Sequence, residues 1–125
     1  MNRHEQREIA MKSIYQNLLL GKDIRRAVYD LTQGQNEVDE FLYTLTIDLV
    51  RNKDAYIEQI NQNLRDDWSF DRLSLLEQSI LLIAYQELKQ VQTARAVVIN
   101  EAVTLAKKYC DDSSYKLING VLDRL

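Results

Sequence analysis

The amino-acid sequence predicts an all-α fold. None of the 125 residues is a proline, so no residue of this type interrupts a long helix. Apolar residues recur three and four positions apart, which places them on one face of a helix. No useful length of chain alternates apolar and polar residues as a half-buried strand does. We expect about seven helices with short connections and antiparallel neighbours.

Capping residues mark the helices of the first half. The first helix is expected over about residues 3–20, and Gly21 ends it. Asp23 can cap a short second helix, and Asn36 can cap a third. A fourth helix is expected to follow near Lys53.

Three further helices are expected in the second half. Ser74 and Glu77 have the spacing of a capping box, in which each side chain bonds a backbone amide of the other residue. Thr93 can cap the next helix, and Asp112 or Ser113 can cap the last one.

Length and composition indicate one domain of two parts. The helical pattern breaks over residues 65–69, so we expect an N-terminal helical subdomain at 1–68 and a C-terminal one at 69–125, together one compact domain. No apolar run approaches the roughly 20 residues that span a bilayer, and the N-terminus lacks the apolar core of a signal peptide. The expected location is therefore cytoplasmic, with no membrane partner.

The charge is unevenly distributed along the chain. Residues 1–26 carry six basic and three acidic side chains, whereas residues 27–74 carry four basic and ten acidic ones. A basic end on an acidic body can meet a polyanion with one face. A solvated helix surface is the competing interpretation of the same pattern.

The sequence contains no recognisable catalytic or metal-binding arrangement. His4 is the only histidine and Cys110 the only cysteine, so a zinc site built from these residue types is excluded. The three glycines are too far apart for a phosphate-binding loop. Clustered carboxylates lie at expected helix ends, where the helix dipole accounts for them. We therefore expect no enzyme, no metal and no cofactor.

The opening turns of the first helix carry the candidate nucleic-acid contacts. Arg3, His4 and Arg7 lie there, and Arg3 and Arg7 are four residues apart, hence on one face. Guanidinium groups so placed can bind phosphates, and Tyr15 could stack on a base.

Two asparagines and a glycine lie inside the last two expected helices. Asn100 and Asn119 are unfavourable within a helix unless their amides find partners, so we expect both to form hydrogen bonds in a packed core. Gly120 costs about 1 kcal/mol relative to alanine, and close approach of a neighbouring helix is the expected compensation.

Two segments in the tail have a distinctive sequence, residues 98–107 (VINEAVTLAK) and 114–123 (SYKLINGVLD). Both closely resemble the NusB family of bacterial antitermination factors. The resemblance extends to the first helix, over residues 7–10 and 14–16, and to the middle of the chain, over residues 68–88.

The resemblance implies a fold of two small helical bundles and a function in transcription regulation. It implies binding to boxA-type RNA, a heterodimer with the small-subunit ribosomal protein NusE, and entry with other Nus factors into the RNA polymerase elongation complex, where termination is suppressed. The family's RNA contacts carry over to Arg3, Arg7, Ser113 and Lys116, and its NusE-binding face to Glu87.

The chain departs from the family pattern at its N-terminus, where residues 3–7 read RHEQR instead of a run of arginines, and at four further positions. Leu82 and Gln78 stand where basic residues are common, Leu117 where an aromatic is usual, and Ala94 where proline is usual. Fewer basic contacts release fewer counterions, so weaker binding to RNA and reliance on a partner are expected.

Two alternatives are also compatible with the sequence. The chain could be a helical protein-interaction module or homodimer without a role in RNA binding. It could instead correspond to the RNA-binding domain of certain rRNA cytosine methyltransferases, although no glycine-rich cofactor loop is present.

Overall fold

The computed structural model describes residues 1–35 and 37–125, which form helices and no strands, so the all-α prediction is confirmed. The α-helices are α1 (Arg3–Leu20), α2 (Ile24–Leu31), α3 (Glu40–Tyr43), α4 (Leu49–Gln62), α5 (Leu75–Gln86), α6 (Arg95–Tyr109) and α7 (Ser114–Arg124). Two π-helical turns, η1 (Thr44–Asp48) and η3 (Glu87–Val91), and a 3₁₀ turn, η2 (Phe70–Arg72), complete the structure.

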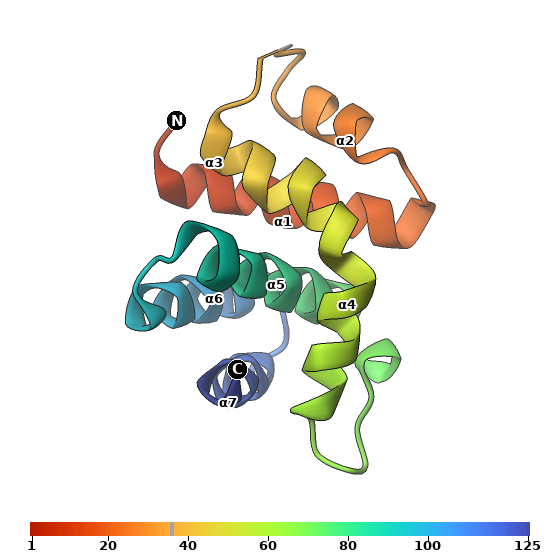
Figure 1. Cartoon of the computed structure of the whole chain (residues 1–125), viewed down its shortest axis with the longest axis vertical. Helices are drawn as coiled ribbons and strands as arrows, with labels where there is room; N and C mark the ends of the chain where they lie inside the picture. The colour runs from red at the N-terminus through yellow and green to blue at the C-terminus, as the bar shows by residue number, and fades with distance from the viewer. Residues whose placement is uncertain (36) are drawn as a thin grey trace.

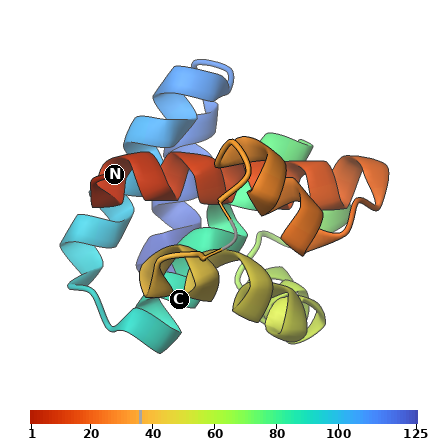
Figure 2. The ribbon, with the colours of Figure 1, turned by 90° about the horizontal axis from the view of Figure 1, so that it is seen from above.

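The helices form layers around α5. Helix α1 packs against α2 and α3 and lies across α5, while α6 packs against α5 and α7 (Figure 1). Helix α4 descends along one side of the molecule and also contacts α5. Seen from above, the loop between α6 and α7 lies on one side of α1, and α3 lies on the other (Figure 2).

Local signals delimit the helices largely as predicted. Gly21 ends α1 in a left-handed conformation with φ of 64°, which glycine adopts without strain. The Asp23 carboxylate accepts hydrogen bonds from two backbone amides at the start of α2. Ser74 and Glu77 form the predicted capping box at the start of α5. These signals act over three or four residues and need no tertiary context.

Other predicted caps are wrong or differ in detail. Asn36 lies outside the described residues, and Asp39 caps α3. Ala94, not Thr93, is the N-cap of α6. The third and fourth expected helices are continuous, since α3, η1 and α4 follow one another with helical backbone at each junction.

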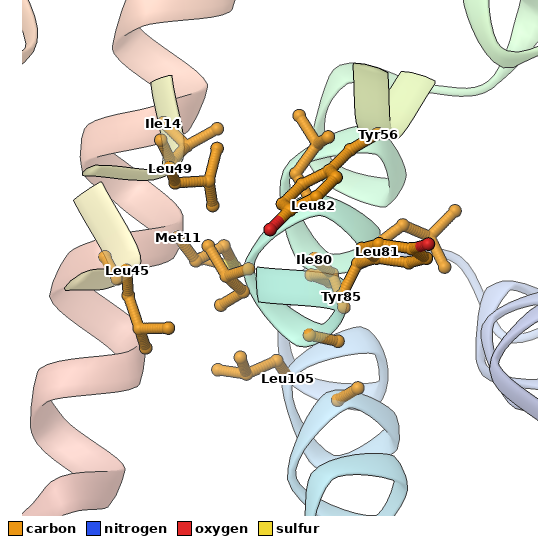
Figure 3. Close-up of a cluster of buried hydrophobic side chains, with 14 of the residues drawn as sticks. Met11, Ile14, Leu45, Leu49, Tyr56, Ile80, Leu81, Leu82, Tyr85 and Leu105 are labelled. Atoms are coloured by element: carbon orange, nitrogen blue, oxygen red, sulfur yellow. The ribbon is translucent and has the colours of Figure 1, made fainter. Parts of the chain in front are cut away.

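The core is centred on α5, whose residues 78–86 are all buried. Figure 3 shows Met11 and Ile14 of α1, with Leu45 and Leu49, on the side of α5 that carries Leu82. Leu105 of α6 lies below α5 in the same view and belongs to the same apolar cluster. Helix α5 is therefore surrounded by other elements from Gln78 to Gln86, as expected of a central helix.

Gln86, a fully buried side chain at the end of α5, is held by several polar groups. Its amide nitrogen donates to the Thr44 carbonyl at 2.9 Å and to the Asp48 carboxylate at 3.0 Å. Its amide oxygen accepts from the Tyr56 hydroxyl at 2.5 Å, and burial raises the pKa of Tyr56, which keeps that donor protonated. Gln86 thereby satisfies a backbone carbonyl of the π turn η1 and ties it to α5.

The two asparagines in the last helices do not lie in the core, contrary to the sequence prediction. Asn100 and Asn119 are exposed and line a shallow groove between α6 and α7. A Cβ added to Gly120 would meet only the Arg124 guanidinium, at 4.0 Å, among the described residues. No neighbouring helix approaches closely there, so packing does not explain this glycine.

Replacing Gln86 by leucine should destabilise the fold by about 2–4 kcal/mol, because buried polar groups around it lose their partners. Urea unfolding monitored by circular dichroism measures this effect. The control Tyr56→Phe removes only one donor to Gln86 and should cost about 1 kcal/mol. Equal destabilisation of the two variants would contradict a central role for the Gln86 amide.

Candidate nucleic-acid interface

One face of α1 carries Arg3 and Arg7, as predicted, and this face is covered by α3. The guanidinium carbon of Arg3 lies 4.1 Å from the centre of the Phe41 ring, and that of Arg7 lies 5.3 Å from it. Arg3 remains exposed, whereas Arg7 is only 6% exposed. Of the two, only Arg3 presents its side chain to solvent.

Arg7 forms a buried ion pair with Glu87, the first residue of η3. Its Nε donates to Oε1 at 2.8 Å and its Nη2 to Oε2 at 2.7 Å, so the contact is bidentate. A second carboxylate, from Glu101 of α6, lies 3.7 Å from Nη1. Glu87 is 2% exposed, so the structure presents neither residue as a free surface contact, in contrast to the expectation from the sequence.

A second face of α1 carries His4, Glu8, Lys12 and Tyr15 and packs beside α6. Glu8 accepts hydrogen bonds from the Tyr109 hydroxyl and, at 3.0 Å, from the ammonium group of Lys108. Lys12 lies 3.8 Å from the same carboxylate. Glu8 therefore holds two lysines from distant parts of the chain close together, while both remain about half exposed.

His4 and Tyr15 lie toward the two ends of this second face. The Nδ1 atom of His4 is 3.0 Å from a Glu101 carboxylate oxygen, and the ring is exposed. Tyr15 is half-buried. Sequence reasoning identified both residues but missed Lys12 and Lys108. Lys12 could have been found from the sequence, because His4, Glu8 and Lys12 follow one another at intervals of four residues and so share one face of the helix.

Ser113 and Lys116 lie at the start of α7, at the position predicted. Both are exposed, and both line a cleft between α7 and the loop that follows α4. Ser113 is the N-cap residue, but its side chain forms no capping hydrogen bond within the described part of the chain. Leu117, where the family pattern has an aromatic residue, is half-buried and lines the same cleft.

Two of the departures from the family pattern are explained by burial. Leu82 is completely buried in the core, where an apolar side chain needs no partner. The Gln78 amide donates to the backbone carbonyls of Phe70 and Leu73 at 3.1 and 3.0 Å. Gln78 thus fixes the turn η2 to α5 and is not on the surface.

Neither a membrane span nor a metal site is found in the described residues. No helix over residues 1–35 and 37–125 combines the length and the apolar content needed to cross a bilayer. Within the same residues, no three side chains of histidine, cysteine, aspartate or glutamate are grouped so as to hold a metal ion.

Replacing Arg7 by leucine should destabilise the protein by about 3–5 kcal/mol, since it leaves the buried Glu87 carboxylate without its partner. The double variant Arg7→Leu/Glu87→Leu should recover most of this stability, because no charge is then left buried at Glu87. Chemical denaturation of both variants checks the prediction. Effects that simply add in the double variant would argue against a coupled pair.

Acid should weaken the contact between α1 and α6. Hydrogen bonds from Tyr109 and Lys108 lower the pKa of Glu8, so its stabilising effect is fully present above the ordinary glutamate pKa of about 4.3. This effect is lost as the pH falls through the lowered pKa. Glu8→Gln should cost about 1 kcal/mol at neutral pH, with the difference from wild type vanishing in acid. Unfolding free energies measured between about pH 6 and pH 3 test this, and a pH-independent difference would contradict it.

Comparison with known proteins gives a consistent result. A family model described as the NusB family matches residues 4–125. The chain is 38% identical over 127 residues to the transcription antitermination protein NusB of Bacillus cereus strain B4264, an alignment that covers 100% of this chain and 97% of the relative. The corresponding protein of Bacillus thuringiensis strain Al Hakam is 37% identical over the same length and coverage.

Solved structures agree with the sequence comparison. T. maritima NusB superposes with a TM-score of 0.83 over 99% of this chain and 89% of that one, at 24% identity, which shows the fold. A structure described as the antitermination factors NusB and NusE in complex with dsRNA matches with a TM-score of 0.72 and 27% identity, over 99% of this chain and 96% of that one. Since the family model and the relatives span nearly the whole sequence, the chain belongs to the NusB family.

Proposed function

We propose that this protein is an RNA-binding transcription antitermination factor. It binds boxA-type RNA together with the small-subunit ribosomal protein NusE and joins the RNA polymerase elongation complex to suppress termination. The observation that carries this proposal is membership of the NusB family over residues 4–125. A similar solved protein bound to both NusE and dsRNA supports it. The protein acts as an adaptor rather than an enzyme, in the cytoplasm, where bacterial transcription takes place.

The RNA-binding surface runs along the second face of α1 toward the start of α7. His4 and Tyr15 contribute from α1, and Ser113 and Lys116 contribute from α7. The exposed ammonium groups of Lys12 and Lys108 support this surface, because Glu8 holds them together where α1 meets α6. Cationic groups fixed in position beside aromatic ones suit single-stranded RNA, which is bound through phosphate contacts and base stacking.

The two arginines of α1 have different roles in this proposal. Arg3 is exposed and provides a lateral phosphate contact at the edge of α3. Arg7 orients α1 through its buried pair with Glu87 and acts on RNA only through the position of its neighbours. Glu87 likewise supports the NusE-binding face from beneath, since its carboxylate is engaged by Arg7.

The test is binding of fluorescein-labelled boxA RNA to the protein in complex with NusE. Lys12→Ala, Lys108→Ala and Lys116→Ala should each weaken binding and reduce the slope of log K against log salt concentration by about 0.7 for each RNA phosphate that is no longer neutralised. Arg51→Ala is a matched control, because it removes an exposed positive charge on α4, away from the proposed surface. Equal affinity for boxA and scrambled RNA would contradict specific recognition. Failure of the complex to bind RNA would leave the chain an interaction module without a role in RNA binding.

A further inference from the structure

A cleft of about 420 Å³ lies between α7 and the loop that follows α4. Apolar side chains from both elements line it, among them Leu64, Trp68, Leu117 and Val121. Its volume falls at the lower end of the range for small-molecule sites, about 300–1,000 Å³, and suits a group of nucleotide size. The family resemblance concerns three residues of this cleft, Ser113, Lys116 and Leu117, and does not include its other lining residues.

Trp68 is the dominant aromatic group of the cleft. It is the only tryptophan of the chain and is 44% exposed, although large aromatic side chains usually bury most of their surface. Its backbone amide donates to the Arg65 carbonyl at 2.9 Å, which closes the turn that carries it. An indole ring presented at a cleft in this way offers a flat surface for stacking.

Positive charge surrounds this ring. In the described part of the chain, Arg65, Lys116 and Arg124 all line the cleft, together with one carboxylate, that of Glu77. The Glu77 carboxylate already accepts from the Ser74 backbone amide in the capping box, at 2.9 Å. One nitrogen of Arg124 donates to the Asn63 carbonyl at 2.7 Å, which fixes α7 to the end of α4. The cleft therefore has fixed walls and an excess of cations, which favours a polyanion over a neutral partner.

Gly120 lines the cleft and, having no side chain, leaves space in it. It lies within α7, where glycine is less favourable than alanine. Among residues 1–35 and 37–125, the only neighbour within 4 Å of the position that its Cβ would occupy is the Arg124 guanidinium. Since packing does not require a glycine here, its effect is to leave the cleft open beside Trp68.

We propose that this cleft binds one nucleotide of single-stranded RNA, with the base stacked on Trp68 and its phosphates near Arg65, Lys116 and Arg124. The cleft is continuous with the proposed RNA surface, because Ser113 and Lys116 belong to both. The inference rests on the proposed function and extends the path of the RNA from the start of α7 toward the loop after α4.

Trp68 also reports directly on occupancy. The labelled boxA RNA is titrated into the NusE complex, and RNA anisotropy and tryptophan emission are recorded together, with the Trp68→Phe complex as the emission baseline. Quenching of Trp68 should follow the anisotropy curve. An RNA with the same backbone and abasic sites should bind through its phosphates but leave Trp68 emission unchanged, because it has no bases to stack.

Variants separate stacking from charge and from folding. Trp68→Leu should weaken binding about 5- to 150-fold, the range expected when one stacked base is removed, whereas Trp68→Phe should stay close to wild type. Gly120→Leu should fill the cleft and weaken binding. Its matched control, Gly120→Ala, improves helix propensity equally well but adds only one carbon atom. Thermal unfolding of each variant verifies that the fold is kept.

The outcomes distinguish this inference from the proposed function. If RNA binds but neither Trp68 emission nor the affinity of Trp68→Leu changes, the cleft proposal is wrong and the proposed function stands. If Trp68 emission changes on adding NusE and does not change further with RNA, the cleft is a protein contact and the proposal is overturned. If the complex binds no RNA, both fail.

Discussion

The structure depends on one constraint, which is that α5 is buried on every side. A helix without a solvent-facing stripe has nowhere to hydrate its polar side chains, so each must find a partner inside the protein. Gln78 bonds the turn η2, Gln86 bonds η1 and α4, and Glu87, which follows α5 directly at the start of η3, pairs with Arg7 of α1. The apolar residues of α5 supply the free energy of burial, while these polar ones determine where each neighbouring element lies.

Features that depend on nearby residues could be predicted from the sequence. The end of α1 at Gly21, the cap at Asp23 and the capping box at Ser74 each involve groups a few residues apart. The continuity of α3, η1 and α4 could not be predicted in this way. Within this continuous stretch, the Thr44 carbonyl of η1 accepts a hydrogen bond from Gln86, which lies 42 residues further along the chain.

In the candidate site too, some features could be predicted from nearby residues and others depend on contacts between distant parts of the chain. Helical spacing placed Arg3 and Arg7 on one face, but it could not show that this face packs on Phe41 or that Glu87 engages Arg7. Asn100 and Asn119 were expected inside because asparagine is unfavourable within a helix unless its amide finds a partner. They are exposed because of the way in which α6 and α7 are oriented about their own axes in the folded protein. Helical spacing shows which residues share a face, whereas only the packing of the whole fold shows whether that face meets solvent or protein.

The contacts that Glu8 forms with α6 have a consequence for the order in which this protein folds during synthesis on the ribosome. Its partners, Lys108 and Tyr109, are about a hundred residues away in sequence, and the partner of Arg7 is 80 residues away. Synthesis at about 5–20 residues per second leaves α1 without these partners for several seconds. The nascent N-terminal segment, although basic, therefore lacks the arrangement of charges found in the finished protein. A chain that stops before α6 would retain the arginines of α1 and the contact of Lys12 with Glu8, but it would lack Lys108 and Tyr109.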